Sequence, residues 1–476
     1  MTTSAQSTST SSSTAASLAA AAKSRALALF GLSLGYFMVL LDTTIVTVAL
    51  PAIHTDMGGK FTSLEWVVNA YTVLFASLLL SMGSLSDRYG AKRIFGGGLI
   101  LFAAASALSS AAPSLGLLIA LRGALGIGGA AMTSASLALI ASIYQDPKER
   151  TKALGVFAAV SGIALAAGPV IGGLLADWIG WRSIFVVNIP IAVLSLLLIV
   201  PNAGETKRNT ERSLDLAGQL TATLFFLALT FALVEGSSLG WSSPLVMTAI
   251  AAAAVSLLLF AVVEARGKSP MLPVRLLRQR SISAGLAAGL AVNFGLSGCL
   301  FVLTFFFQQG RGYSALLTGL SFLPLTLPMM LFPMLTSRIV NRVGVRLPMI
   351  CGFFVTAVGT AMLTVASGAF YWLLFAGLLL IGTGLSLTIP PLVTSVVTAA
   401  PPGQAGVASG ALNSIRQLGA ALGVAVLSLC MNGAGARAEI AASADGVNTA
   451  LLVSALVFAG GGGITLLFIG RKPAKG

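Results

Sequence analysis

The sequence predicts an all-α integral membrane protein, because long apolar stretches recur along it and charges are scarce. Of its 476 residues, 56% are hydrophobic and only 9% are charged, against roughly 25% charged in ordinary soluble domains. A helix crosses the bilayer core in about 20 apolar residues, and fourteen stretches reach about that length. This composition excludes a soluble protein, whose surface needs more polar residues.

The fourteen predicted membrane spans are separated by short polar connections. They cover residues 27–50, 64–82, 94–112, 115–143, 152–175, 183–201, 215–235, 244–263, 281–307, 315–336, 347–366, 370–397, 405–430 and 450–470. An even number of spans places both termini on the same side of the membrane.

The positions of the basic residues predict which side that is. Of the 28 Lys and Arg residues, 22 fall in the segments that share a side with the termini. Four fall on the other side, namely Lys60, Arg182, Arg311 and Arg437. Because Lys and Arg accumulate in cytoplasmic loops, we expect both termini in the cytoplasm and the protein in a bacterial cytoplasmic membrane.

A short repeat predicts how the spans are organised. SDRYGAKR at 86–93 links the second and third spans, and VNRVGVR at 340–346 links the tenth and eleventh. Two six-span halves with an inserted pair account for this spacing, and repeated halves are common in membrane transporters. The predicted parts are a disordered tail (1–26), an N-terminal half (27–201), inserted spans with flanking loops (202–280), a C-terminal half (281–470) and a second tail (471–476).

Eight motifs follow one another along the chain. They are LLDTTIVTVALP (40–51), GSLSDRYGAKR (83–93), RGALGIGGA (122–130), GVFAAVSGIALAAGPVIGG (155–173), WRSIFVVNIP (181–190), LVEGSSLGW (233–241), FFFQQGRGYS (305–314) and GALNSIRQLGAALG (410–423). Together they resemble the major facilitator superfamily, in its fourteen-helix branch of drug:proton antiporters. The overall appearance resembles actinomycete antibiotic exporters, including methylenomycin-resistance proteins.

The resemblance implies the major facilitator fold and an exporter that exchanges small amphiphilic drugs for protons by alternating access. We expect small-molecule substrate, protons and the lipid bilayer as its partners, no cofactor, and a monomeric state. Export of an endogenous metabolite or an organic anion remains an alternative. A gated channel and a membrane-embedded sensor or enzyme are disfavoured, and no GxxxxGK[ST] motif for ATP hydrolysis occurs.

Asp42 is the principal candidate for proton coupling. A carboxylate near the bilayer centre costs about 2.5–3.5 kcal/mol on insertion scales, and Asp42 is the only acid that we place well inside a predicted span. Arg122 in the fourth span lies at a similar depth, about 10–12 Å below the outer surface at 1.5 Å per residue. The resemblance links this arginine to proton coupling, although a purely structural role for either residue stays open.

Further polar residues predict a substrate cavity between the halves. Glu65 begins the second span and is either an anchor at the membrane surface or a secondary contact for cations. Arg416 lies within the membrane, so we expect it to have a partner. The predicted cavity residues are Asp42, Glu65, Trp66, Asn69, Tyr71, Asn293, Asn413, Arg416 and Gln417.

Two glycine-containing segments are candidates for gating. Asp87, with the charged residues near it, is expected on a tight turn, where it either sets topology or latches the cytoplasmic side. Glycines flanking a proline in the fifth span predict close packing and a kink. The gating candidates are Gly83, Asp87, Arg88, Gly90, Arg93, Gly168, Pro169, Gly172 and Gly173.

Other kinds of site find little support in the sequence. The net charge is +14, but the basic residues form no continuous stripe with aromatic residues, which argues against nucleic-acid binding. Cys299, Cys351 and Cys430 lie in apolar stretches without metal-ligand spacing, and His54 is the only histidine. We therefore expect no metal site.

Overall fold

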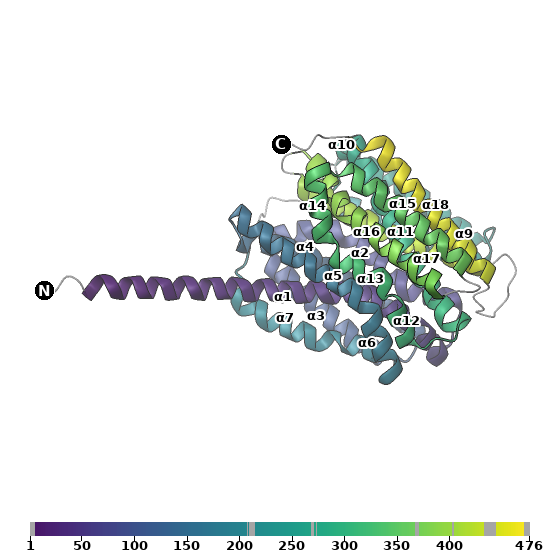
Figure 1. Cartoon of the computed structure of the whole chain (residues 1–476), viewed down its shortest axis with the longest axis horizontal. Helices are drawn as coiled ribbons and strands as arrows, with labels where there is room; N and C mark the ends of the chain where they lie inside the picture. The colour runs from purple at the N-terminus through teal and green to yellow at the C-terminus, as the bar shows by residue number, and fades with distance from the viewer. Residues whose placement is uncertain are drawn as a thin grey trace.

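The computed structural model is a bundle of long helices (Figure 1). It describes residues 5–206, 208, 215–267, 271–272, 274–366, 371–401, 404–432 and 444–470. Among these residues there is no β-strand, in agreement with the all-α class that the sequence predicts.

The helices follow one another through short connections. The first group is α1 (Ala5–Met57), α2 (Phe61–Tyr89), α3 (Ala91–Ser110), α4 (Leu115–Ile143), α5 (Pro147–Trp178), α6 (Ser183–Val186) and α7 (Asn188–Asn202). The middle group is α8 (Leu216–Leu239), α9 (Pro244–Arg266) and α10 (Val274–Leu277). The last group is α11 (Arg280–Phe305), the π-helical turn η1 (Phe306–Gly310), α12 (Ala315–Ser321), α13 (Leu323–Leu331), α14 (Pro333–Val343), α15 (Arg346–Ala366), α16 (Tyr371–Ala399), α17 (Ala405–Asn432) and α18 (Ala444–Phe468).

The number of membrane-spanning helices agrees with the predicted fourteen. Within the described residues, thirteen helices are long and apolar enough to cross a membrane, and α13 with α14 makes a fourteenth as a pair bent by 53°. The predicted tenth span, 315–336, is therefore broken rather than continuous. Pro333 starts α14 directly after the break, where its missing N–H removes a helical hydrogen bond.

The predicted sixth span is also interrupted. Its residues form the short α6 and then α7, with a break at Val187. Pro190 lies in the first turn of α7 and has no N–H to donate to Val186, four residues earlier. Proline is tolerated in a first helical turn, so the chain restarts the helix there.

The predicted disordered tail is helical from Ala5, because α1 continues backward beyond the membrane span. Figure 1 shows this part of α1 projecting from the bundle as a single rod. Extending an existing helix avoids the cost of nucleation, and alanine, frequent in residues 15–22, is the best helix former. The sequence-based expectation of disorder in residues 5–26 therefore differs from the structure.

The packing separates the helices into three sets. Helices α1 to α7 pack mostly among themselves, as do most of α11 to α18. Between these sets α2 meets α17, and α5 meets α12 and α13. Helix α8 lies against both α2 and α17, while α9 packs chiefly against α8. This arrangement is compatible with two halves and an added pair, and the domain boundaries themselves stay a prediction.

One end of the bundle carries the N-terminal side of α1 and the end of α18 (Figure 1). There Ser24 Oγ donates to Asn202 O at 3.3 Å, and Arg25 pairs with Glu149 at 2.9 Å. We call this end the terminal face and the other end the opposite face.

Candidate functional site

The centre of the candidate site is an ion pair between Asp42 on α1 and Arg122 on α4. Arg122 Nη1 donates to Asp42 Oδ2. The side chains are 0% and 1% exposed, so water does not screen the pair. The sequence placed these residues at similar depth, and the structure brings them into contact.

Three further contacts hold the guanidinium in place. Arg122 Nε donates to the Val67 carbonyl oxygen of α2 at 2.8 Å, and its Cζ lies 4.6 Å from the Tyr71 ring centroid. The Tyr71 hydroxyl in turn donates to Val39 O of α1 at 3.1 Å. Arg122 thus connects α1, α2 and α4, and the predicted cavity residue Tyr71 serves as part of its support.

Asp42 has a second neighbour that the sequence reading missed. Asn188 Nδ2 at the start of α7 lies 3.5 Å from Asp42 Oδ1, at the limit of a hydrogen bond, and also donates to Ser106 Oγ at 3.0 Å. Asn188 belongs to the motif WRSIFVVNIP, and this motif is the sequence feature that could have pointed to it. An uncharged amide beside the pair can accommodate either protonation state of the carboxyl.

The burial of this pair makes it sensitive to the loss of either charge. Removing one partner of a buried ion pair typically costs 3–5 kcal/mol, as an order of magnitude, because the other charge is left uncompensated. A proton on Asp42 neutralises the carboxylate without removing its atoms. Neutralising either side chain would therefore change how α1 and α4 are held together.

Glu65 on α2 is a second buried acid, with a side chain only 1% exposed. It contacts Ser428 of α17, and its Oε2 has no hydrogen-bond partner among the described residues. Its neighbour Trp66 donates instead to Glu235 of α8 at 3.1 Å. Glu65 is thus covered by α17 near the start of α2 rather than exposed, as an anchor at the membrane surface would be.

Asn69, one turn along α2 from Glu65, is fully buried. Neither of its amide atoms has a hydrogen-bond partner within the described part of the chain. The structure thus encloses this predicted cavity residue in the bundle, where a rearrangement of α2 would give its amide new partners.

The polar residues predicted in the C-terminal half form a separate cluster. Arg416 Nε on α17 donates to Asn293 Oδ1 on α11 at 3.1 Å, so the expected partner of Arg416 is found. Tyr36 of α1 lies close enough to interact electrostatically with Arg416. Asn413 and Gln417 are half-buried on the same helix. At 1.5 Å per residue, Tyr36 lies about 9 Å nearer the terminal face than Asp42.

Helix α5 packs against α1 beside Asp42 through two glycines. A Cβ at Gly168 would overlap Thr44 Oγ1, and one at Gly172 would lie 2.7 Å from Ile45 O. Thr44 and Ile45 follow Asp42 by two and three residues. The α1 backbone just after Asp42 is therefore in direct contact with α5.

The same segment of α5 also contacts α12 of the C-terminal half. A Cβ at Gly173 would overlap Ala315 O, and one at Gly319 would overlap the carbonyl oxygen of Pro169. Backbones approach this closely only where side chains are absent. The predicted gating residues of α5 are thus at a junction between the halves, near Asp42.

Hydrogen bonds join the halves near the opposite face. Both carboxylate oxygens of Asp177, at the end of α5, accept backbone N–H groups of α12, from Ala315 at 3.1 Å and Leu316 at 2.8 Å. Gln308 Nε2 donates to Val48 O of α1 at 2.8 Å. These bonds and the glycine contacts join the halves at the opposite face, α1 to η1 and α5 to α12, and we call this the closed arrangement.

This junction yields a first prediction, on Gly173→Ala. The added methyl would meet Ala315 O, so the closed arrangement should be destabilised by about 1–3 kcal/mol of overpacking. We expect transport to slow at least about fivefold and the α12 amides to exchange with deuterium faster. Gly162→Ala on the same helix is the control, because its Cβ would lie 3.5 Å from Met329 O. Equal effects of both changes would contradict the assignment.

The predicted turn at 83–93 is shorter than expected. Helix α2 continues to Tyr89, so Gly83, Asp87 and Arg88 are helical, and the turn is confined to Gly90, whose φ is +101°. Helix α2 extends beyond its apolar stretch because polar residues can continue a helix in water. In the second copy Gly344, with φ +80°, links α14 to α15 in the same way.

Charged residues around this turn have defined contacts. Arg88 lies over the Tyr89 ring at 5.6 Å, and Asp87 is half-buried at the end of α2. Arg93 Nε is 3.8 Å from Glu205 Oε2. The latch function of Asp87 stays a prediction.

Glu205 and Thr206, after α7, are contacts of this turn that the sequence reading missed. Glu205 Oε1 accepts the Lys92 N–H at 3.0 Å, and Thr206 Oγ1 accepts the Ala91 N–H at 2.8 Å. They satisfy N–H groups at the start of α3, which a helix leaves unpaired. The turn is therefore tied to the end of the N-terminal half.

No group of three or more His, Cys, Asp or Glu residues suited to a metal ion occurs in the part of the chain that the structure describes. The site thus consists of an ion pair, a second acid and a polar cluster around Arg416, all on packed helices. Such an arrangement can move protons and bind polar groups.

Comparisons with known proteins identify relatives over most of the chain. Multidrug resistance protein Stp of Mycobacterium tuberculosis (strain CDC 1551 / Oshkosh) is 36% identical over 405 residues, covering 85% of this chain and 75% of that protein. The methylenomycin A resistance protein of Bacillus subtilis (strain 168) is 34% identical over 403 residues, covering 84% and 86%. The resemblance to antibiotic-resistance proteins that the motifs indicated is confirmed.

A solved structure and a family profile extend the match to most of the chain. A POT family transporter crystallised with a thioalcohol-conjugated peptide superposes with a TM-score of 0.70, covering 93% of this chain and 96% of that one. At 13% identity this similarity concerns the fold alone. The sequence profile of the Major Facilitator Superfamily matches residues 32–424. Together with relatives above 30% identity, this match shows that the chain is a transporter rather than an enzyme and belongs to the Major Facilitator Superfamily.

Proposed function

We propose that the protein is a proton-coupled antiporter that exports small amphiphilic drugs or antibiotics across a bacterial cytoplasmic membrane. The observation that carries this proposal is the buried Asp42–Arg122 pair, which a proton can neutralise without removing an atom. The names of the relatives support export, since they are described as multidrug and methylenomycin A resistance proteins. We further propose a monomer with both termini, and hence the terminal face, in the cytoplasm.

The mechanism couples the protonation of Asp42 to the position of α5. With Asp42 ionised, Arg122 holds α1 against α4. A proton releases Arg122, and α1 can then shift against the glycine face of α5, which contacts Thr44 and Ile45. Because α5 also contacts α12, this shift acts on the opposite face. In an antiporter the proton arrives from outside while that face is open, so the shift favours its closure. The proton then leaves to the cytoplasm, and Asp42 pairs with Arg122 again before substrate enters. The Asp42 carboxyl exchanges its proton with the outside when the opposite face is open, and with the cytoplasm when the terminal face is open.

The closed opposite face corresponds to an inward-open stage of this cycle. The bonds of Asp177 and Gln308 and the α5–α12 contacts occlude the external side. A substrate from the cytoplasm or the inner leaflet then reaches Arg416, Asn293 and Tyr36, which lie nearer the terminal face than Asp42. Opening outward requires breaking the contacts at the opposite face.

The test is the movement of protons with substrate in proteoliposomes. Puromycin and ethidium serve as probes, with a pH-sensitive dye inside the vesicles. Under the proposal, adding a transported probe to vesicles with an acidic interior raises the internal pH, since protons leave as the probe enters. A probe that accumulates against its gradient with no proton movement would refute antiport.

A second candidate, export of organic anions, is favoured by one observation. Arg416 bonds to Asn293, an uncharged amide, so its positive charge is available to an anionic substrate. Arg416→Gln separates the two candidates. If the variant loses transport of an anionic probe but keeps transport of ethidium, the result favours organic anions as substrates. If it loses ethidium transport but keeps transport of the anionic probe, the result favours cationic and neutral drugs.

A further inference from the structure

A pocket on the flank of the N-terminal half lies at the terminal face, apart from the Asp42–Arg122 site. It is a cavity of about 360 Å³ between the start of α3 and the end of α7, closed on one side by the segment that follows α7. We call it the flank pocket. Its lining residues are Lys92, Arg93, Gly96, Leu196, Ile199, Val200, Glu205 and Arg208.

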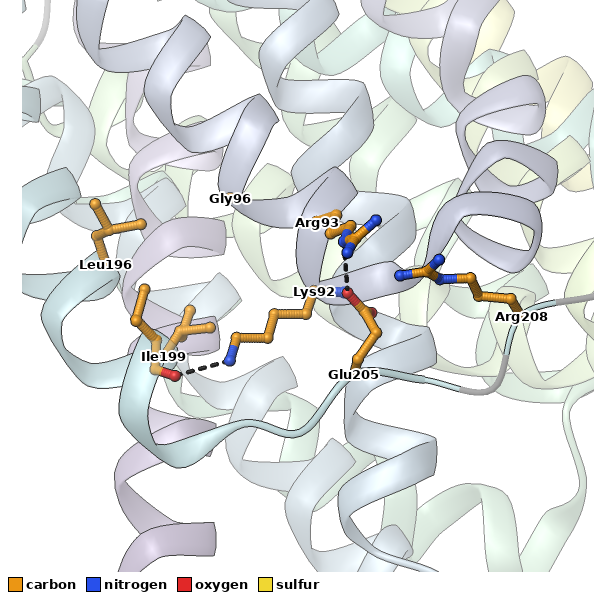
Figure 2. Close-up of a pocket in the computed structure, with 8 residues that line it drawn as sticks. Lys92, Arg93, Gly96, Leu196, Ile199, Glu205 and Arg208 are labelled. Atoms are coloured by element: carbon orange, nitrogen blue, oxygen red, sulfur yellow. Dashed lines mark hydrogen bonds and ion pairs between the residues drawn. The ribbon is translucent and has the colours of Figure 1, made fainter.

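The polar wall of the flank pocket carries an excess of positive charge. Three basic side chains face one carboxylate, that of Glu205. Arg93 lies 3.8 Å from this carboxylate. Lys92 Nζ donates to Val200 O at 2.7 Å, which uses one of its three hydrogens. Arg208 extends back toward Glu205 and Lys92 (Figure 2). An anion placed here meets at least two positive charges that Glu205 does not offset.

The other wall is apolar and continues along the helices. Leu196, Ile199 and Val200 of α7 line the pocket beside Gly96 of α3. One turn farther from the terminal face, exposed apolar side chains follow on both helices, with Ile100 on α3 at 59% and Leu197 on α7 at 65% exposure. A residue four positions on lies on the same helix face, so Ile100 prolongs the face of Gly96. The pocket thus opens onto a surface suited to hydrocarbon chains.

We propose that the flank pocket binds the phosphate headgroup of an acidic phospholipid, whose acyl chains lie along α3 and α7. Basic pockets between membrane helices bind such headgroups. A free phosphate offers the same charge, but it makes no use of the apolar wall. Glu205, which lines this pocket, also accepts the N–H of Lys92 and pairs with Arg93. A bound lipid phosphate competes for Arg93 and thereby acts on the turn between α2 and α3.

Native mass spectrometry of the purified full chain tests this binding without any transport assay. The probes are phosphatidylglycerol, phosphatidylcholine and inorganic phosphate. The test variant is Lys92→Gln with Arg208→Gln. The control is Arg338→Gln with Arg342→Gln, which removes the same charge from exposed positions of α14 at the same face.

We expect the wild type and the control to retain one tightly bound phosphatidylglycerol and to prefer it to phosphatidylcholine. In the test variant its dissociation constant should rise about 30-fold, since each basic residue near an anionic surface contributes about a fivefold gain in affinity. Equal losses in test and control variants would overturn the proposal in favour of diffuse attraction. Displacement of the lipid by millimolar inorganic phosphate would overturn it in favour of a free-anion site.

Discussion

Asp42→Asn is expected to abolish export driven by a proton gradient while leaving substrate exchange intact. Asparagine keeps the shape and part of the hydrogen bonding to Arg122, but it cannot release a proton. For one-for-one exchange, a pH difference of about two units sustains at most about a 100-fold substrate gradient. In proteoliposomes the variant should bring the internal and external substrate concentrations to a ratio near one, whereas the wild type should accumulate substrate.

The control for this change is Asp56→Asn on the same helix. Asp56 pairs with Arg182 where both side chains are almost half exposed, and such pairs contribute little. The Asp56→Asn variant should therefore build the same substrate gradient as the wild type. Counterflow of labelled substrate without a pH gradient should persist in Asp42→Asn, which separates lost coupling from misfolding. If Asp42→Asn still builds a gradient, the proton is carried elsewhere and the assignment of Asp42 is wrong.

Arg122 gives a companion prediction, because its removal leaves Asp42 buried without a cation. Arg122→Ala should change the pH dependence of transport as well as its maximal rate. Combining it with Asp42→Asn removes both charges and should restore stability relative to Arg122→Ala alone. Thermal unfolding of the three variants in detergent measures this coupling. Additive losses would show that the pair does not act as a unit.

The fold class follows from local properties of the chain. Apolar stretches of membrane-spanning length predicted fourteen spans, and each corresponds to a helix or to a helix with a break. The breaks near Pro190 and Pro333 depend on where each proline falls within a helical turn. The length of an apolar stretch gives no information about this position. A serine-rich composition favours disorder, whereas the continuation of α1 back to Ala5 follows from the helix that is already formed beside it.

The candidate site was predictable in its residue types but not in its contacts. Depth along two helices placed Asp42 and Arg122 at the same level, yet only the lateral packing of α1 against α4 brings them together. Asn188 is contributed by a helix much later in the chain. Glu205 resembles any solvated carboxylate after a membrane span, and its role follows from the return of that segment to the start of α3.

Glu65 shows most clearly what sequence position conceals. It lies four residues into α2, about 6 Å along the helix axis, where side chains commonly reach the membrane surface. In the structure α17 covers it, through a contact with Ser428 from the other half. Its carboxyl forms none of the ion pairs among the described residues, and Glu235 lies close enough to repel its negative charge. An ionised carboxylate enclosed in this way costs several kcal/mol.

Glu65→Gln is therefore expected to remove the pH dependence of closure at the opposite face. In the wild type, a high external pH ionises Glu65 whenever that face opens, and the charge opposes the return of α17. Each 1.4 kcal/mol of this cost changes the ratio of open to closed molecules about tenfold. Glutamine carries no charge at any pH, so the variant should remain mostly closed between pH 5 and 9.

Distances between spin labels at the opposite-face ends of α2 and α17 measure this closure across the same pH range. In the wild type the distance between the two labels should increase as the pH rises. In Glu65→Gln it should stay short across the whole pH range. Glu235→Gln is the matched control, because Glu235 already bonds to Trp66 and Ser238. This variant should keep the pH dependence of the distance. A pH-dependent distance that survives Glu65→Gln would assign the response to another group. Loss of the response in Glu65→Gln alone makes this carboxyl a second proton-sensitive group beside Asp42, and one that lies between the halves.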